Sequence, residues 1–429
     1  MKLLIITYSY TPDLTPRAFR WSAVAGQLAR MGHEVHVLCA SAPGAAIELA
    51  GDGVSIYRVR DWLLNASTRV TPGIATAKPS GVRRPYAGLR SFLRKTIRAV
   101  WRATYWPDYA CGWVLPAAGA ARDLCMANHY DWIISVSHPF SGHVVGLLAK
   151  GYAPDSKWFV DIGDPFCLMK EPSPNNRRLY GRLNRAIEHR VVTKGDAISV
   201  TTDSTRHLYE SSFSLPAKKV KVIPPLLSLP ASPASSPRQG GEPIRLIFVG
   251  TLYRNLRSPR FLLMCFSALI RALPERCLEL HFYGAVNDCA GDFAACPESL
   301  QPSLFVHGMV GRHEVLQAMV DADLLVNIGN DSESQFPSKV IEYMAVGKPI
   351  LNLVSIRGDT SAEALADYPA ALTVARTEEG PSQAIIGSLC AFVLHPPRVD
   401  PALAENVRQR YSATQVAALY ASMLEQGTA

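Results

Sequence analysis

The sequence predicts an α/β protein built from two doubly wound domains. Short apolar runs of strand length alternate with segments of helix length along most of the 429 residues. The first such unit is an apolar run at 3–6, an amphipathic stretch at about 18–31, Gly32 as a stop signal and a second apolar run at 34–39. Strands that alternate with helices favour a parallel sheet. The alternation restarts at Ile244 after a stretch rich in Pro, Ser and Gly, which predicts a second sheet.

Each domain is expected to contain further strands. We predict them at 132–136, 158–161, 197–201 and 220–223 in the first domain, and at 244–249, 279–283, 304–307, 324–328 and 350–353 in the second. These positions place a first domain at 1–227, a linker at 228–243, a second domain at 244–401 and a closing helix at 402–429 that packs back on the first domain. Ligands of doubly wound sheets bind beyond the carboxyl ends of the strands, so we expect the two domains to face a common cleft.

The composition excludes a disordered chain, and the charge is unevenly distributed. Hydrophobic residues make up 48% and charged residues 19%, which provides enough apolar surface for large cores. The formal charge is +8, and residues 62–107 contain nine basic residues and no acidic one, so the rest of the chain is close to neutral. One cationic segment argues against a nucleic-acid-binding surface spread over the protein and for a local anionic partner.

We expect no leader, membrane span or metal site. The apolar start at 3–6 is too short for a signal peptide, and no run approaches the ~18 apolar residues of a membrane span. The nine cysteines are scattered without a Cys-x-x-Cys pair, so neither a disulfide framework nor a zinc site is expected. The sequence therefore predicts a cytoplasmic protein that could still lie on the inner face of a membrane.

The segment 327–349 carries the most chemical information. A polar loop ends at Pro337, and a helix is expected to open at about Ser338 and to end before Pro349. The unpaired N–H groups of a helix start favour a diphosphate. Lys339 opposes the helix dipole and so needs another purpose, while Glu342, one turn further on, could accept hydrogen bonds from two ribose hydroxyls. The alternative is an ordinary amphipathic helix.

These residues resemble the carboxyl-terminal signature of the GT-B glycosyltransferases, in particular the retaining family 4 group. That group carries a Glu-x7-Glu pair whose first Glu contacts the donor sugar and whose second contacts the ribose. Glu342 matches the second position, and Ser334 occupies the first, with Glu333 beside it. The resemblance implies that Ser334 bonds the sugar more weakly, that Glu333 takes over, or that the donor chemistry is altered. It also implies that the two domains are Rossmann-like.

The stretch 244–258 resembles the family's strand that leads into a Gly-Arg turn, followed six residues later by a Lys. The two cations hold the donor diphosphate in the family. Here Gly250 begins the turn, Thr251 stands at the Arg position, Arg257 at the Lys position and Arg254 between them. Arginine suits bidentate phosphate contact and can stabilise a leaving diphosphate. A solvated turn of arginines is the alternative.

Two stretches in the first domain resemble family elements near the transferred sugar. In 131–143 a strand leads to His138-Pro139, where the family has His-Glu-Pro with its His directed at the donor sugar. Near the first helix the family's Gly-rich loop is replaced, so Arg17 and Arg20 could meet an anionic acceptor. Asp161 and Asp164 follow a strand and could face the cleft, with helix capping and turn formation as the alternative.

The cationic segment can be phased as a helix over 83–105, with apolar and aromatic side chains on one side. The residues expected at a membrane surface are Arg90, Arg94, Lys95, Arg98, Trp101 and Arg102. Basic amphipathic helices with aromatic residues suit anionic bilayers. The alternative is a core-packed helix with a solvated basic face.

We therefore expect a retaining hexosyltransferase of GT-B architecture that needs no metal or cofactor and uses a nucleotide-diphosphate sugar as donor. Arg257 and His138 are the expected catalytic residues, with a glycan or lipid-linked acceptor and no nucleic acid. Two alternatives remain, a non-catalytic GT-B subunit of a polysaccharide assembly complex and a sugar-nucleotide epimerase or hydrolase. The sequence leaves open the base, the sugar, the acceptor, the linkage and the oligomeric state.

Overall fold

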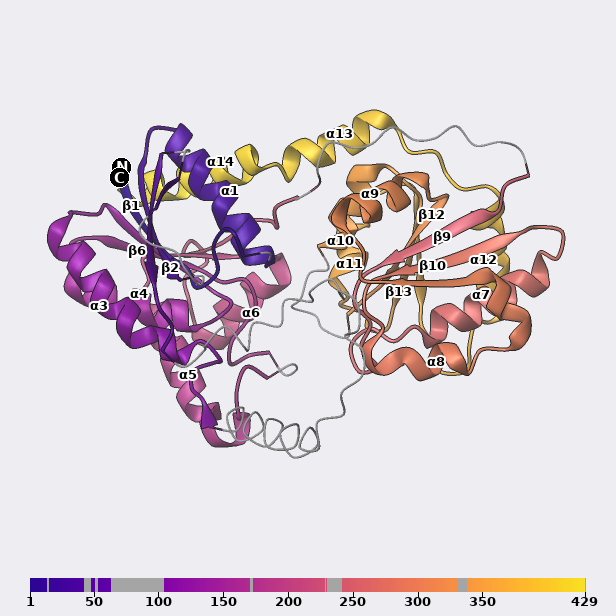
Figure 1. Cartoon of the computed structure of the whole chain (residues 1–429), viewed down its shortest axis with the longest axis horizontal. Helices are drawn as coiled ribbons and strands as arrows, with labels where there is room; N and C mark the ends of the chain where they lie inside the picture. Colours follow the sequence, from indigo (N-terminus) through magenta and orange to yellow (C-terminus); the bar gives the residue numbers. More distant parts are fainter. Residues whose placement is uncertain are drawn as a thin grey trace, which may run out of the picture. The chain divides into compact units, whose positions relative to one another are not determined.

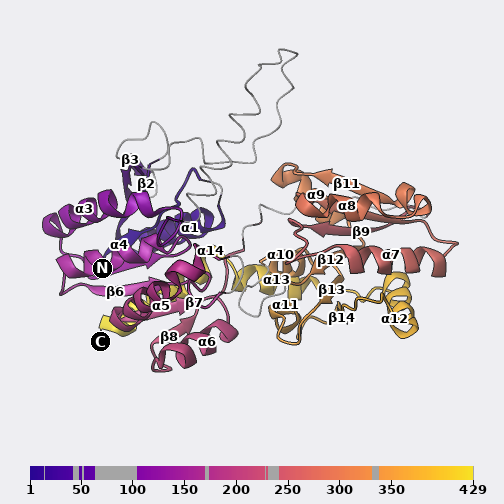
Figure 2. The same cartoon turned by 90° about the horizontal axis from the view of Figure 1, so that it is seen from below.

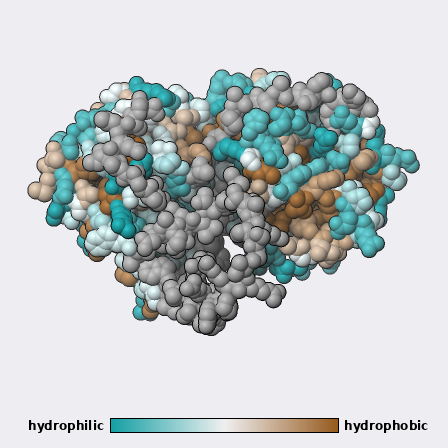
Figure 3. Space-filling model, viewed as in Figure 1, coloured by the Kyte–Doolittle hydropathy of each residue, from teal (hydrophilic) through white to brown (hydrophobic). Residues whose placement is uncertain are grey.

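The computed structural model describes residues 1–13, 15–41, 48–50, 53–62, 104–169, 173–227, 229, 241–330 and 338–428. These residues form two compact units (Figures 1 and 2). The first unit consists of 1–224 and 413–429, and the second of 225–412. Each is built on its own parallel sheet with helices on both faces, as the sequence predicts. In the face shown by Figure 3, hydrophilic and hydrophobic residues are interspersed on each unit.

The sheet of the first unit has the described strand order β3-β4-β2-β1-β5-β6-β7-β8. Every neighbouring pair in it is parallel except β3 with β4. Leu3–Ile6 in the central strand β1 are fully buried, which explains why the sequence there is an unbroken apolar run. The strands are β1 (Lys2–Ile6), β2 (Glu34–Ala40), β3 (Glu48–Ala50), β4 (Val54–Val59), β5 (Trp132–Val136), β6 (Lys157–Asp161), β7 (Ala197–Val200) and β8 (Val220–Val222).

Helices cover both faces of this sheet. One face carries α1 (Pro16–Arg30) and α14 (Ala413–Thr428), which lie side by side, and the other carries α3 (Cys111–Ala127), α4 (Ser141–Tyr152), α5 (Arg177–Lys194) and α6 (Asp203–Phe213). The first helix begins where local chemistry favours it. Thr15 caps α1 by accepting a hydrogen bond from the Ala18 N–H, and Pro16 supplies a helical φ at the first position.

The sheet of the second unit has the described order β11-β10-β9-β12-β13-β14 and is parallel throughout. Alternate residues of its central strand point to two separate cores, Leu246 and Phe248 to one and Ile247 and Val249 to the other. The strands are β9 (Ile244–Val249), β10 (Leu278–Tyr283), β11 (Leu304–Gly308), β12 (Leu324–Ile328), β13 (Ile350–Val354) and β14 (Ala371–Ala375).

The helices of the second unit divide between these two cores. The first core is covered by α7 (Arg260–Ala272) and α12 (Gln383–Leu394), and the second by α9 (Arg312–Asp321), α10 (Lys339–Val346) and α13 (Pro401–Arg410). Shorter elements are η1 (Asn287–Cys289), α8 (Ala290–Ala294), η2 (Glu298–Ser303) and α11 (Thr360–Ala364). Among the described helices, none combines the length and the apolar character needed to cross a bilayer.

The closing helix expected over 402–429 is two helices. The helix α13 packs on α10 in the second unit, and only α14 packs on the first unit. The break falls at Tyr411, the C-cap residue of α13. Its carbonyl accepts a hydrogen bond from the Leu227 N–H at 2.8 Å, outside the helix. Most of the predicted linker at 228–243 and nearly all of the cationic segment lie outside the described residues.

Candidate active site

Arg257 is a partly buried cation at the carboxyl ends of β9 and β12. Its Nη2 donates a hydrogen bond to Asn330 Oδ1 at 2.7 Å, and Asn330 follows β12. Burial lowers the pKa of Arg257, while Tyr343, Asp359 and Tyr253 act in the opposite direction. Within the described residues Arg257 Nε has no hydrogen-bond partner. The guanidinium therefore retains hydrogen-bonding capacity at the edge of the sheet where ligands of parallel sheets bind.

Two glycines allow the backbone to pack closely at this point. A Cβ on Gly250 would lie 3.0 Å from Arg257 Nη1, and a Cβ on Gly284 would lie 2.1 Å from the Gly250 carbonyl oxygen. Gly284 also has a φ of +130°, which side-chain-bearing residues rarely adopt. The absence of a side chain at Gly250 therefore lets Arg257 pack against the backbone of the turn after β9.

Thr251 and Arg254 belong to the same turn but have different surroundings. Thr251 is half-buried directly after Gly250. Arg254 is exposed and held by η1, because its N–H donates to Asp288 Oδ1 at 3.0 Å and its Nη2 to the Asp288 carbonyl at 3.1 Å. Of the two arginines, Arg257 is the less exposed.

The start of α10 carries the predicted Lys339 and Glu342. Lys339 Nζ lies 2.7 Å from Glu342 Oε2, so this ion pair accounts for a lysine in a helical turn where the dipole disfavours it. The Glu342 carboxylate is largely buried and the Lys339 ammonium is about a third exposed, at 34%. Among the described residues, Ser338, the N-cap residue, makes no side-chain capping bond, and the first N–H groups of an α-helix have no acceptor within the helix.

Tyr343 attaches α10 to the end of β9, and sequence reasoning misses it. Its hydroxyl accepts a hydrogen bond from the Val249 N–H at 2.9 Å, and its ring is fully buried. This contact brings the start of α10 to the same sheet edge as Arg257. The predicted partners Glu333, Ser334 and Pro337 lie outside the described residues.

In the first unit, His138 lies exposed just beyond the carboxyl end of β5. Its ring centroid is 5.7 Å from that of Tyr109. Two residues later, the ring of Phe140 stacks on Phe166 with centroids 4.0 Å apart. Among the described residues, no group of three or more His, Cys, Asp or Glu side chains is arranged to hold a metal ion.

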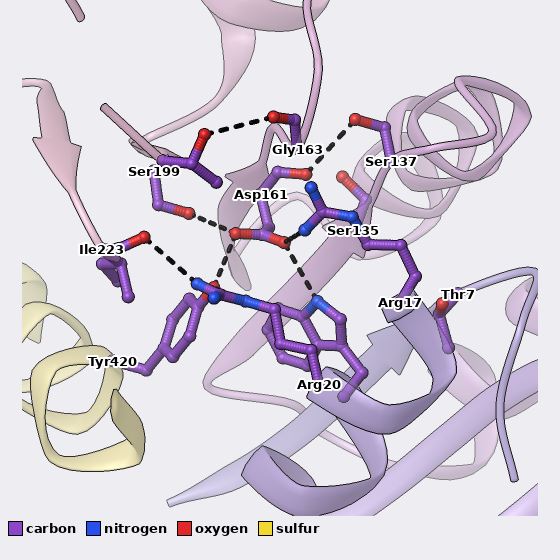
Figure 4. Close-up of polar contacts among 12 residues, drawn as sticks. Thr7, Arg17, Arg20, Ser135, Ser137, Asp161, Gly163, Ser199, Ile223 and Tyr420 are labelled. Carbon is purple, nitrogen blue, oxygen red and sulfur yellow. Dashed lines mark hydrogen bonds and ion pairs between the residues drawn. The ribbon is translucent and has the colours of Figure 1, made fainter. Parts of the chain in front are cut away.

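The structure corrects the expectation that Arg20 and Asp161 face an acceptor. Figure 4 shows the Asp161 carboxylate surrounded by partners from its own unit. Its Oδ1 accepts hydrogen bonds from Ser199 Oγ and Tyr420 Oη, both at 2.6 Å, and its Oδ2 accepts one from Trp21 Nε1 at 3.0 Å. Asp161 is 2% exposed and Arg20 5% exposed. Both are structural residues in the unit's interior.

Arg20 and Asp161 interact electrostatically in the interior of the unit, and both bond the hydroxyl of Tyr420. Burial alone would raise the pKa of Asp161, but Arg20, then Arg17, and the hydrogen bonds from Ser199 and Tyr420 lower it overall. Arg20 donates to Tyr420 Oη at 2.8 Å and to the carbonyl oxygens of Pro224 and Ile223 at 2.6 and 3.3 Å. Each of the three guanidinium nitrogens of Arg20 therefore bonds within the unit.

Arg17 and Asp164 remain near the sheet edge. Arg17 Nη1 lies 3.4 Å from Asp161 Oδ2, and the side chain is 17% exposed. The guanidinium lies directly over Gly163, where a Cβ would be 1.4 Å from Arg17 Nη2. Asp164, the next residue, is half-buried.

Two family models match the two halves of the chain. Residues 18–225 match the glycosyl transferase 4-like domain, and residues 243–389 match the glycosyl transferases group 1. The chain belongs to the family 4-like glycosyltransferases. As a group 1 glycosyltransferase it uses a nucleotide-sugar donor. The predicted enzyme class and the family resemblance are thereby confirmed.

Solved structures share the fold of this glycosyltransferase. A glycosyltransferase from Rickettsia africae matches with a TM-score of 0.63 at 10% identity, over 100% of this chain and 98% of that one. The lipopolysaccharide outer core galactosyltransferase WaaB matches with a TM-score of 0.61 at 11% identity, over 99% of both chains. HepE of Anabaena, in complex with UDP and glucose, matches with a TM-score of 0.57 at 12% identity, also over 99% of both. These matches confirm the predicted GT-B fold, and no curated protein matches the chain in sequence.

Proposed function

We propose that this glycosyltransferase moves a hexose from a nucleotide-diphosphate sugar, with retention and without a metal ion, to a lipid-linked or polysaccharide acceptor of the cell surface. Arg257 is the observation that carries the proposal. It is a partly buried cation whose Nε has no hydrogen-bond partner among the described residues, at the sheet edge where ligands bind. A planar fork of N–H donors matches the oxygens of a diphosphate.

The start of α10 would complete the donor site. Lys339 and Glu342 pair with each other across one helical turn. In our proposal the donor separates this pair, so that Lys339 contacts phosphate and Glu342 accepts hydrogen bonds from the ribose hydroxyls. The first-turn N–H groups of α10, which have no acceptor within the helix, would favour the same negative charge. Thr251, Arg254, Glu333, Ser334 and Pro337 remain predicted donor contacts.

Transfer would occur on one face of the sugar. The bond from C1 to the diphosphate oxygen breaks, the acceptor oxygen bonds to C1 from the same face, and the acceptor proton passes to the departing phosphate oxygen. Arg257 stabilises the charge that develops on the diphosphate. We assign no protein nucleophile. His138 would contact the transferred sugar, and Arg17 and Asp164 the acceptor.

The acceptor and the membrane are supported by different observations. WaaB, which shares the fold, is a galactosyltransferase of the lipopolysaccharide outer core. The sequence of 83–105 has the pattern of a basic amphipathic helix, although these residues lie almost entirely outside the described part of the chain. We propose that this segment contacts an anionic bilayer from the cytoplasmic side.

Steady-state kinetics of Arg257→Ala tests the donor site, once thermal shifts with nucleotide sugars have identified the donor. We expect kcat/KM to fall by about 10²–10³-fold, as for the loss of one charge-stabilising donor. Arg271→Ala, an exposed arginine on α7, is the matched control and should leave the kinetics unchanged. A kcat/KM for Arg257→Ala close to that of the wild type would contradict the role of Arg257.

Three further outcomes separate the proposal from its alternatives. Nuclear magnetic resonance of the product should show the anomeric configuration of the donor, and an inverted product would refute retention. Nucleoside diphosphate released equally fast without any acceptor would indicate a hydrolase. No thermal shift with any nucleotide sugar would indicate a non-catalytic subunit.

Vesicle sedimentation tests the membrane contact. The wild type should sediment at low salt with vesicles that contain phosphatidylglycerol, since each basic residue near such a surface contributes about 1 kcal/mol. The triple variant Arg90→Glu, Arg94→Glu, Arg98→Glu should remain in the supernatant. Equal sedimentation of the two proteins would exclude this segment as the membrane contact.

A further inference from the structure

The first unit contains a cavity of about 660 Å³ beside α5, which we call the α5 pocket. One side is the first half of α5, with Arg177, Arg178, Leu179 and Arg182, and the other is the loop after β6, with Phe166 and Met169. Its volume is within the range of small-molecule sites. The loop follows the carboxyl end of β6, so the pocket opens at the ligand-binding edge of the sheet.

Buried hydrogen bonds hold the two sides of the α5 pocket together. The Glu188 carboxylate on α5 accepts hydrogen bonds from the N–H groups of Phe166 and Cys167 at 3.0 and 2.7 Å, and from Tyr209 Oη at 2.5 Å. Asn184, also on α5, accepts one from Trp106 Nε1 at 3.0 Å. These bonds fix Phe166 and Cys167, which line the pocket, against α5 before any ligand binds.

The charge of the α5 pocket is strongly one-sided. Four arginines line it, Arg185 being the fourth, and no Asp or Glu is among its described lining residues. The acidic residue of α5, Glu188, is 1% exposed, and both of its oxygens are already bonded within the unit. Within the described residues, Arg177, Arg178 and Arg182 form no ion pair with a carboxylate. Such a pocket attracts an anion with several oxygens.

Apolar side chains lie next to these arginines. Leu179 is 62% exposed and Leu183 is 46% exposed, and they are four residues apart on the same face of α5. Met169 adds a further apolar side chain to the wall of the α5 pocket. The arginines would bind an anionic group, and the neighbouring apolar side chains would contact an apolar chain. A ligand that has both parts would therefore match this surface.

An aromatic stack joins the α5 pocket to the loop that carries His138, the predicted sugar-contacting residue. Phe166 in its wall stacks on Phe140 with an interplanar angle of 13°, and Phe140 is two residues after His138. All of these residues belong to the first unit. The pocket is thus next to the edge at which we expect the acceptor.

We infer that the α5 pocket binds the phosphate or diphosphate group of an amphiphilic acceptor. Arg178 and Arg182 contact the phosphate oxygens, and the apolar chain runs along Leu179 and Leu183. This inference rests on the proposed glycosyl transfer, since it names the class of molecule that receives the sugar. The sequence predicts one cationic surface, at 62–107, and does not predict a second on α5. The α5 arginines form a site only because the helix places them on the same face, where they line one pocket.

Titration calorimetry with farnesyl diphosphate tests this inference. The experiment uses the Arg257→Ala protein, so that the diphosphate has no intact donor site to occupy. Arg178→Gln with Arg182→Gln should weaken binding by about tenfold or more, the effect of losing charge-assisted hydrogen bonds. Arg190→Gln is the matched control, because Arg190 is exposed on the same helix but outside the pocket, and should bind like the parent.

Two other probes identify the source of the phosphate. Inorganic diphosphate should bind more weakly than farnesyl diphosphate, and Leu179→Ser should weaken only the farnesyl compound. If the double arginine variant loses affinity for phosphatidylglycerol vesicles but keeps that for farnesyl diphosphate, the surface takes a phospholipid headgroup and the inference is wrong. Unchanged farnesyl diphosphate affinity in the double variant also overturns it. These assays contain no donor, so their failure is distinct from a failure of glycosyl transfer.

Discussion

Replacing Asp161 by Asn should destabilise the first unit severely. The carboxylate has two acceptor oxygens, and an amide has only one. If the NH₂ group replaces Oδ1, the hydroxyls of Ser199 and Tyr420 lose their acceptor, and if it replaces Oδ2, the Trp21 N–H loses its acceptor. Arg20 would also remain buried without its charge partner. Breaking a buried pair from one side costs about 3–5 kcal/mol. At about 2–4 °C per kcal/mol for a domain of this size, the melting temperature should fall by about 10 °C.

Tryptophan fluorescence is the assay for this prediction. All seven tryptophans of the chain fall between residues 21 and 158, so their emission reports on the first unit alone. Ser199→Ala is the graded control, because it removes one hydrogen bond and keeps the charge, and should cost about 1 kcal/mol. A loss below about 1 kcal/mol for Asp161→Asn at pH 7 would refute the reasoning.

The pH dependence gives this prediction a second readout. The pKa of Asp161 is lowered in the folded protein, relative to about 3.9 in an unfolded chain. Its contribution to stability is therefore present above about pH 4 and is lost as the pH falls through the folded-state pKa. The difference in unfolding free energy between wild type and Asp161→Asn should be constant from about pH 5 to 8 and shrink below about pH 4. A difference that persists undiminished at pH 2 would show that the charge is not responsible.

Three further substitutions test the proposed donor site and the proposed acceptor contact. Glu342→Ala should raise the donor KM by about 10-fold or more with a smaller effect on kcat, whereas Glu405→Ala on the exposed face of α13 should change neither. Tyr343→Phe should cost about 1–2 kcal/mol and speed hydrogen exchange at the end of β9, and an unchanged exchange rate would contradict the anchoring role. Gly163→Ala should displace Arg17 and raise the acceptor KM with an unchanged donor KM, and equal changes in both would contradict an acceptor role for Arg17.

The strands covered on both faces are the part of the fold that the sequence predicts best. The strands β5, β9 and β12 begin and end at the predicted residues, because a strand between two layers of helices is a continuous apolar run. The sequence does not predict β4 or β14. The former is only partly buried and the latter pairs on one side at the sheet's edge, so neither has such a run.

The proposed donor site is predictable only where spacing along the chain and the resemblance to the family's signatures define it. Arg257 and Glu342 follow from their positions after a strand and within a helix. Tyr343 and Asn330 do not, because each acts on a partner far away in sequence, 94 residues for Tyr343 with Val249 and 73 for Asn330 with Arg257. The stabilising contacts of a buried polar side chain become visible only when the fold brings the partners together.

Arg20 shows why a charged residue can be assigned to a binding site from sequence although the fold buries it. An arginine at a helix entrance is ordinarily exposed, and its burial here depends on Tyr420, which lies 400 residues away. The chain leaves the first unit after Pro224 and returns to it at Ala413. Arg20 donates to the carbonyl oxygen of Pro224 on the departing segment and to Tyr420 on the returning helix. One buried side chain therefore bonds both segments by which the chain leaves and re-enters the first unit, and these bonds within the unit compensate for the burial of its charge.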